Sequence, residues 1–103
     1  MTRPQNTVGF VGDTAVLQCR TNESVWTLYW SSGRDGKNIA SSIKGVFEGY
    51  PRLSLDDSSD GQFDLVINPT LLEDADIYGC SESFVFTSAE LVLLGKCFVS
   101  VCY

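Results

Sequence analysis

The residues that could support covalent or acid–base chemistry in this 103-residue chain are few and poorly placed for it. The chain contains no histidine, which removes the usual general base and the commonest transition-metal ligand. Ser41 and Lys44 match a Ser-x-x-Lys pattern, but they lie in a segment predicted as a strand, without the helix that such nucleophiles use. We therefore predict no catalytic residue and expect that the chain is not an enzyme.

Metal chemistry is equally poorly supported. The run 56–61 (Asp-Asp-Ser-Ser-Asp-Gly) begins like a calcium-binding loop, but its twelfth position is Ile67, where such a loop needs a bidentate glutamate. The four cysteines lack the paired short spacing of a zinc site. We predict no metal and no cofactor, and we interpret the acidic run as a polar hairpin turn.

The composition is that of one soluble globular domain, with 44% apolar and 19% charged residues. A net charge of −6 and a pI of about 4.3 repel the phosphates of nucleic acids and the headgroups of anionic membranes. The apolar run 91–103 is interrupted by Lys96 and is too short to cross a bilayer. We expect neither nucleic-acid binding nor direct membrane insertion by this segment.

The hydrophobic pattern has a period of two, which is typical of β-strands with one buried face. Strand-like runs rich in valine, isoleucine, threonine and aromatic residues alternate with polar turns at intervals of roughly 8–12 residues. The predicted strands are 8–11, 14–19, 28–31, 38–43, 46–48, 52–55, 63–67, 77–83 and 86–94. A short helical turn is predicted over 69–74, because proline is tolerated at a helix start. About nine strands without an amphipathic helix predict an all-β sandwich or barrel.

Three segments carry a family resemblance. They are 13–19 (Asp-Thr-Ala-Val-Leu-Gln-Cys), 28–30 (Leu-Tyr-Trp) and 74–80 (Asp-Ala-Asp-Ile-Tyr-Gly-Cys). The spacing of cysteine, tryptophan and second cysteine, with a tyrosine two residues before the second cysteine, resembles an immunoglobulin domain. The resemblance implies an immunoglobulin-like antiparallel β-sandwich.

The resemblance also implies a role for each hallmark residue. Cys19 and Cys80 would form a disulfide between the two sheets, closing a loop of about 62 residues and stabilising the fold by roughly 4 kcal/mol. Trp30 would pack against that bridge, filling the space between the sheets. The hydroxyl of Tyr78 would bond to the backbone a few residues upstream.

The spacing favours the variable type of this fold. Fifty positions separate Trp30 from Cys80, which leaves room for two extra strands between Ile39 and Tyr50. The resemblance implies an ion pair between Arg52 and Asp74 that closes one end of the sandwich. The alternative is that these are two solvated surface charges.

The chain departs from rearranging antigen receptors near its end. Phe86-Thr87-Ser88-Ala89 stands where those receptors carry Phe-Gly-x-Gly, and the third loop, 81–85, is very short. Ser31-Ser32-Gly33 replaces the glutamine-containing run that often pairs receptor chains. The chain therefore resembles a variable-type domain of a non-rearranging cell-surface or secreted receptor-like protein, which would be extracellular.

We divide the chain into an immunoglobulin domain, 1–94, and a C-terminal tail, 95–103, with two further cysteines. Four cysteines are normal for a secreted chain and many for a cytosolic one. Cys97 and Cys102 have three alternatives: an intrachain bridge, an interchain bridge that makes a covalent dimer, or free thiols. Asn22 opens an Asn-Glu-Ser acceptor for N-glycosylation, so we keep a glycoprotein as a hypothesis.

Function in such a fold depends on loops and exposed faces. We predict a recognition or adhesion module that binds another protein or itself as a homodimer through the sheet that contains Trp30. The alternative is an innate immune binder of microbial carbohydrate or another ligand that uses the inter-strand loops. Aromatic side chains often anchor interfaces. The predicted partner-binding residues are Tyr29, Trp26, Phe47, Tyr50, Phe84 and Val85.

Overall fold

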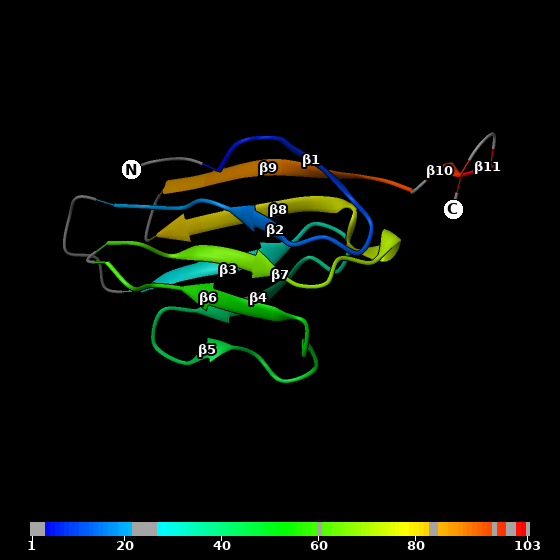
Figure 1. Ribbon diagram of the computed structural model, residues 1–103. Helices are drawn as coiled ribbons and strands as arrows, with labels where there is room; N and C mark the ends of the chain where they lie inside the picture. The colour runs from blue at the N-terminus through cyan, green and yellow to red at the C-terminus, as the bar shows by residue number, and fades with distance from the viewer. Residues whose placement is uncertain are drawn as a thin grey trace.

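The structure is a computed structural model that describes residues 4–21, 27–59, 61–82, 85–95, 97–98 and 101–102 (Figure 1). Its strands are β1 Thr7–Phe10, β2 Ala15–Leu17, β3 Leu28–Ser32, β4 Lys37–Ser41, β5 Gly45–Val46, β6 Leu53–Asp56, β7 Asp64–Ile67, β8 Asp76–Glu82, β9 Val85–Leu94, β10 Cys97–Phe98 and β11 Val101–Cys102. A short 3-10 helix, η1, spans Leu72–Asp74.

Nine of these strands form two sheets that face each other (Figure 1). One sheet has the order β1-β9-β8-β3-β4-β5 and the other has the order β2-β7-β6. Neighbouring strands within both sheets run antiparallel, apart from β1, which pairs in parallel with β9. The predicted all-β sandwich of about nine strands is confirmed. The two strands β4 and β5 beside β3 agree with the variable type.

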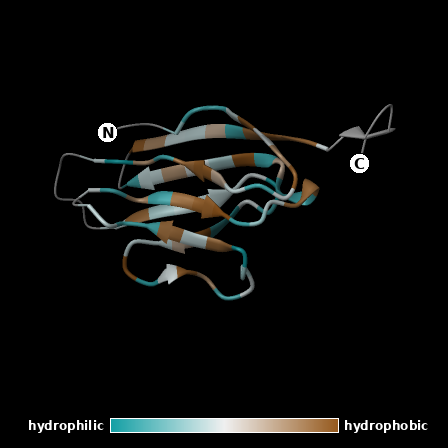
Figure 2. Cartoon of the chain, in the orientation of Figure 1, coloured by the Kyte–Doolittle hydropathy of each residue, from teal (hydrophilic) through white to brown (hydrophobic). Residues whose placement is uncertain are grey.

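Alternation along each strand builds the core. In β2, β3 and β9 every second side chain is buried, and the intervening ones face solvent. Hydrophobic residues appear along the strands and hydrophilic ones at many of the turns in Figure 2. Trp30 lies at the centre with none of its surface exposed, and its indole Nε1–H donates to the Phe63 carbonyl over 2.8 Å. This bond satisfies the one polar group of the buried ring.

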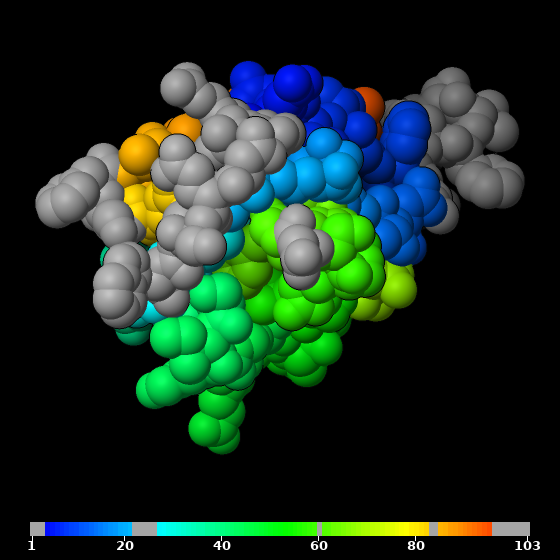
Figure 3. Space-filling model, turned by 90° about the vertical axis from the view of Figure 1, so that its left-hand side faces the viewer, coloured from blue at the N-terminus to red at the C-terminus, as the bar shows by residue number. Residues whose placement is uncertain are grey.

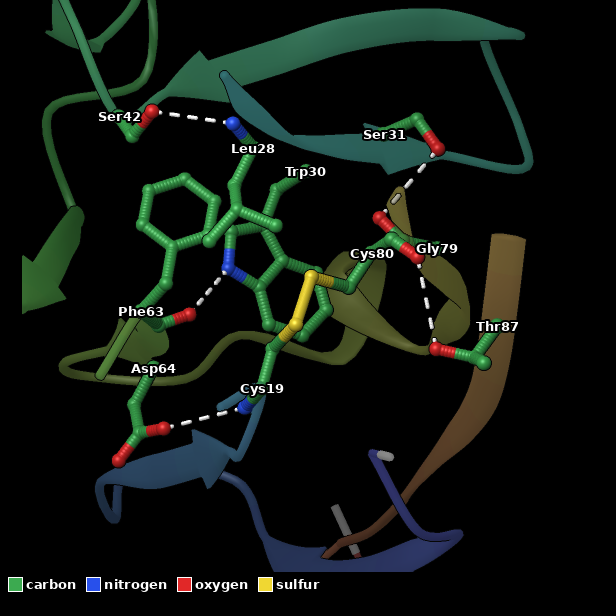
Figure 4. The surroundings of a disulfide bond; sticks show 10 residues. All are labelled: Cys19, Leu28, Trp30, Ser31, Ser42, Phe63, Asp64, Gly79, Cys80 and Thr87. Atoms are coloured by element: carbon green, nitrogen blue, oxygen red, sulfur yellow. Dashed lines mark hydrogen bonds between the residues drawn. A yellow bond between two sulfur atoms is a disulfide. The ribbon is translucent and has the colours of Figure 1, made fainter. Parts of the chain in front are cut away.

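A disulfide joins the two sheets beside Trp30 (Figure 4). Cys19 follows β2 and Cys80 lies in β8, and both are fully buried. The buried carboxylate of Asp64 accepts a hydrogen bond of 3.1 Å from the Cys19 amide N–H and forms an ion pair with Arg20. The backbone at the Cys19 end of the bridge is therefore held within the three-stranded sheet, by a side chain of β7.

A second set of polar contacts closes one end of the sandwich. Arg52 makes a two-pronged ion pair with Asp74, with one of the two contacts, from Nη2 to Oδ1, at 2.9 Å. Tyr78 donates its hydroxyl to the Asp74 carbonyl over 2.7 Å. The hydrogen bond with Asp74 raises the pKa of Arg52. Burial, and then the nearby carboxylates, raise the pKa of Tyr78 well above its ordinary value.

Several predicted strands have different bounds in the structure. The strand predicted over 38–43 ends at Ser41, because the Lys44 amide donates to the Ser41 hydroxyl and Gly45 turns the chain with a φ of 79°. Ile43 therefore lies in a turn. The helical turn predicted over 69–74 is confined to η1. The tail was predicted without strands, but it contains β10 and β11, which lie beyond the end of the sandwich in Figure 1.

Candidate protein-binding face

The outward side of the six-stranded sheet carries two aligned rows of small or aromatic residues. Strand registers place the first row directly across four strands, as Ser41, Tyr29, Ser81 and Phe86, of which Ser41 is itself buried. The second row, one step along, is Asn38, Ser31, Gly79 and Ser88. None of these eight residues carries a formal charge at neutral pH. We call these eight residues the central face.

The Phe86 ring is the most prominent apolar group of the central face, with 63% of its surface exposed. It lies over Gly79 of the neighbouring strand, because a methyl group built on Gly79 would collide with the outer edge of that ring. The same methyl group would meet the Ser31 hydroxyl oxygen at 2.9 Å. The missing side chain at Gly79 therefore lets the aromatic ring lie across the sheet.

Further apolar side chains lie at the β1 edge, separated from Ser88 of the central face by the exposed Glu90 of β9. Val8 and Phe10 of β1 lie opposite Val92 and Leu94 of β9 in the parallel register. All four are exposed, and Ile77 of β8 is also exposed on this sheet. Singly exposed apolar residues are ordinary, but several of them together at one edge of a sheet are typical of an interaction surface.

The outward side of the three-stranded sheet differs. Its central row is Val16, Val66 and Ser54, and Asp56 follows on β6. Val16 is exposed at 43% of its surface. The hydroxyl and amide of Ser58 donate to Asp56, which lowers the pKa of that carboxyl group. The charged turn beside this side makes it less suitable for an extended dry contact.

A cavity of about 230 Å³ opens at the closed end of the sandwich, next to the Arg52–Asp74 ion pair. Tyr50, Tyr78 and Ser32 also line it. Among the charged groups that line it, Arg52 pairs with Asp74 and Glu73, Arg34 donates to the Ala75 carbonyl, and Asp76 accepts from the Ser32 hydroxyl. We assign it a structural role.

Within the described residues, no three acidic or cysteine side chains gather in a way that could hold a metal ion. The same part of the chain contains no helix with the length and apolarity needed to cross a membrane.

Comparison with known proteins gives structural matches alone. No protein-family model matches the chain, and no curated protein does either. The structure of Dpr1 IG1 bound to DIP-eta IG1 superposes with a TM-score of 0.81 at 15% identity, covering 90% of this chain and 91% of that one. The ZIG-8 IG1 homodimer gives 0.77 at 18% identity, with 91% and 84% covered. DIP-gamma IG1+IG2 gives 0.82 at 17% identity, and the match covers 91% of this chain but 47% of that longer one.

The chain folds as an immunoglobulin domain. The strand order, the inter-sheet disulfide and the buried tryptophan all agree with that fold. The superpositions establish the architecture. At identities of 15–18% they do not identify a binding partner, which has to be argued from the surface.

The predicted partner-binding residues do not form one cluster in this immunoglobulin domain. Tyr29 lies in the central face, half-buried, and Val85 is exposed at the start of β9. Tyr50 packs against the core and lines the cavity at the closed end. Phe47 follows β5, in the segment that forms the lower edge of the molecule in Figure 3. Trp26, Phe84 and the sequon at Asn22 lie outside the described residues.

The sequence interpretation missed Phe86 as a surface residue, because it aligned this aromatic with a family motif. The alternation on β9 contains the signal. Ala89, Leu91 and Leu93 are buried, so Phe86 belongs to the opposite, outward phase. Gly79 belongs to the outward phase of β8, but the Phe86 ring above it leaves it buried.

Proposed function

We propose that this immunoglobulin domain is a non-catalytic recognition module that pairs through its central face. The observation that carries the proposal is the exposed Phe86 ring lying over Gly79, within two rows of uncharged residues. Aromatic side chains with small neighbours can be desolvated at low cost, because no charge has to be removed from water.

The partner we propose is a second copy of this chain. The domain carries a net charge of −6, and like charges brought together at an interface oppose association. The eight residues of the central face add no charge at the contact, and the exposed Glu90 lies beside them on β9. Dpr1 IG1 with DIP-eta IG1 and the ZIG-8 IG1 homodimer are examples of pairing between domains of this fold.

We place the domain outside the cell, in a receptor-like or secreted protein. The support is chemical, because the buried disulfide between Cys19 and Cys80 requires an oxidising compartment to form and persist. A carbohydrate ligand, the alternative raised by the sequence, has no support from the neighbouring structures.

Sedimentation equilibrium over a range of concentrations tests the proposal. We expect a reversible dimer for the unmodified domain and a loss of at least about thirtyfold in its association constant for Phe86→Ser, since an anchoring aromatic residue contributes about 2 kcal/mol or more. Val16→Ser is the matched control, because it removes an exposed apolar side chain from the other sheet. A domain that stays monomeric, or a dimer that Val16→Ser weakens as much as Phe86→Ser, would contradict the proposal.

A further inference from the structure

The two cysteines of the tail occupy opposed positions of a hairpin. β10 and β11 pair antiparallel, with Cys97 opposite Cys102 and Phe98 opposite Val101. They form a two-stranded sheet of their own and pair with no strand of the sandwich in the described part of the chain (Figure 1).

The backbone register suits a covalent link. Directly opposed residues of an antiparallel pair have Cα atoms roughly 4.5–5.5 Å apart. Disulfides accept Cα separations of roughly 4.4–6.8 Å. The register therefore brings Cys97 and Cys102 within bridging distance without any movement of the backbone.

Within one chain, Cys97 and Cys102 can form a disulfide only with each other, because the other two cysteines are already joined. The chain has four cysteines, and Cys19 and Cys80 are joined in the core with no exposed surface. We propose that Cys97 and Cys102 form an intrachain disulfide that closes the β10–β11 hairpin. This proposal is independent of the proposed function.

The reaction balances with a small-molecule disulfide, such as oxidised glutathione, as the oxidant. One cysteine thiolate attacks the oxidant and releases one of its halves as a thiol, giving a mixed disulfide. The second cysteine thiolate displaces the other half. The protein loses two protons and two electrons and gains one S–S bond, and the oxidant is reduced to two thiols.

The location predicts a bridge that opens separately from the one in the core. The hairpin lies beyond the end of the sandwich, so a small thiol can approach it while the domain stays folded. The core bridge is fully buried, so a reductant reaches it only when the sandwich opens. Mild reduction should therefore break the hairpin disulfide while the immunoglobulin domain stays folded. We call this separately reducible Cys97–Cys102 bridge the clasp.

Peptide mapping without reduction tests the bridge. Trypsin cleaves after Lys96 and releases 97–103, which contains both tail cysteines. We expect this peptide to be lighter by about 2 Da, the two hydrogens lost on oxidation, than after full reduction. Recovery of 97–103 with alkylated thiols, or as a dimer of two peptides, would overturn the proposal.

Graded reduction with alkylation tests the clasp. We expect Cys97 and Cys102 to be alkylated at reductant concentrations that leave Cys19 and Cys80 unmodified, with no change in the thermal unfolding midpoint. The Cys97→Ser/Cys102→Ser variant is the control, and it should fold with the same midpoint and incorporate no alkylating agent under these conditions. Simultaneous alkylation of all four cysteines would refute a separately released clasp.

Discussion

The two sides of the six-stranded sheet use neighbouring residues of the same strands for different tasks. In β3, Trp30 is completely buried and the adjacent Tyr29 faces outward. In β9, Leu91 is 1% exposed, whereas Phe86 is 63% exposed. The inward side holds large interlocked apolar groups, and the central face on the outward side holds small uncharged groups around two aromatic residues, Tyr29 and Phe86. Because successive strand residues point to opposite faces, folding and recognition can be changed separately.

Trp30→Ala, on the inward side, should lower the stability more than any other substitution proposed here. The variant loses a fully buried ring and leaves the Phe63 carbonyl without its 2.8 Å donor. We expect the free energy of unfolding to fall by about 3–5 kcal/mol. Urea denaturation measures this loss. Tyr29→Ser on the same strand is the control, and an equal loss for the two variants would show that the two sides are not separable.

Arg52→Ala should come next, through the closed end of the sandwich. The Asp74 carboxylate is then left partly buried without its two-pronged partner, which should cost about 3 kcal/mol. Thermal and urea unfolding measure the change. Dimer association, in the range where the variant stays folded, should not change, because Arg52 is not part of the central face. Lys37→Ala, at an exposed cation, should alter stability by no more than about 0.5 kcal/mol. Equal losses of stability in Arg52→Ala and Lys37→Ala would indicate that Arg52 and Asp74 are only solvated charges.

Tyr78→Phe should cost about 1–2 kcal/mol, because the buried Asp74 carbonyl loses a donor at 2.7 Å. It should also change the pH dependence. The pKa of Tyr78 is raised in the fold, so above pH of about 10 the unfolded chain releases its proton and the folded domain retains it. Stability should therefore fall as the pH rises above about 10, and less steeply in Tyr78→Phe. Parallel pH profiles for the two proteins would rule out this contribution.

Gly79→Ala should have the smallest effect on stability and a clear one on recognition. The added methyl group has to displace the Phe86 ring, which is exposed and free to move, so we expect a loss of at most about 1 kcal/mol. Tilting the ring should weaken dimerisation in sedimentation experiments. Ser88→Ala is the control, because it changes a residue of the same face without adding bulk. Gly36→Ala would not serve, because Gly36 has a φ of 63°, where an alanine is strained. If Gly79→Ala dimerised as strongly as the unmodified domain, the position of the Phe86 ring would not matter for binding.

The sequence predicted the architecture well because the fold depends on patterns that are visible along the chain. The period of two predicts strands with one buried face, and Leu17, Trp30 and Leu65 in three of those strands are all buried. The surface was harder to predict. Which aromatic residue lies across the sheet depends on the register between β8 and β9, which places Phe86 next to Gly79. Tyr50, a predicted interface residue, packs partly against the core, and its exposure depends on tertiary contacts that a local pattern does not contain.

The central claim is that the outward side of the six-stranded sheet is the binding surface. Amide chemical shifts of the isotope-labelled domain, followed from low to high protein concentration, test it most directly. We predict concentration-dependent shifts concentrated on β9, β8 and β3, with the amides of Phe86, Gly79 and Tyr29 among the largest. Shifts concentrated on β2, β7 and β6, or a spectrum that does not change with concentration, would contradict the account.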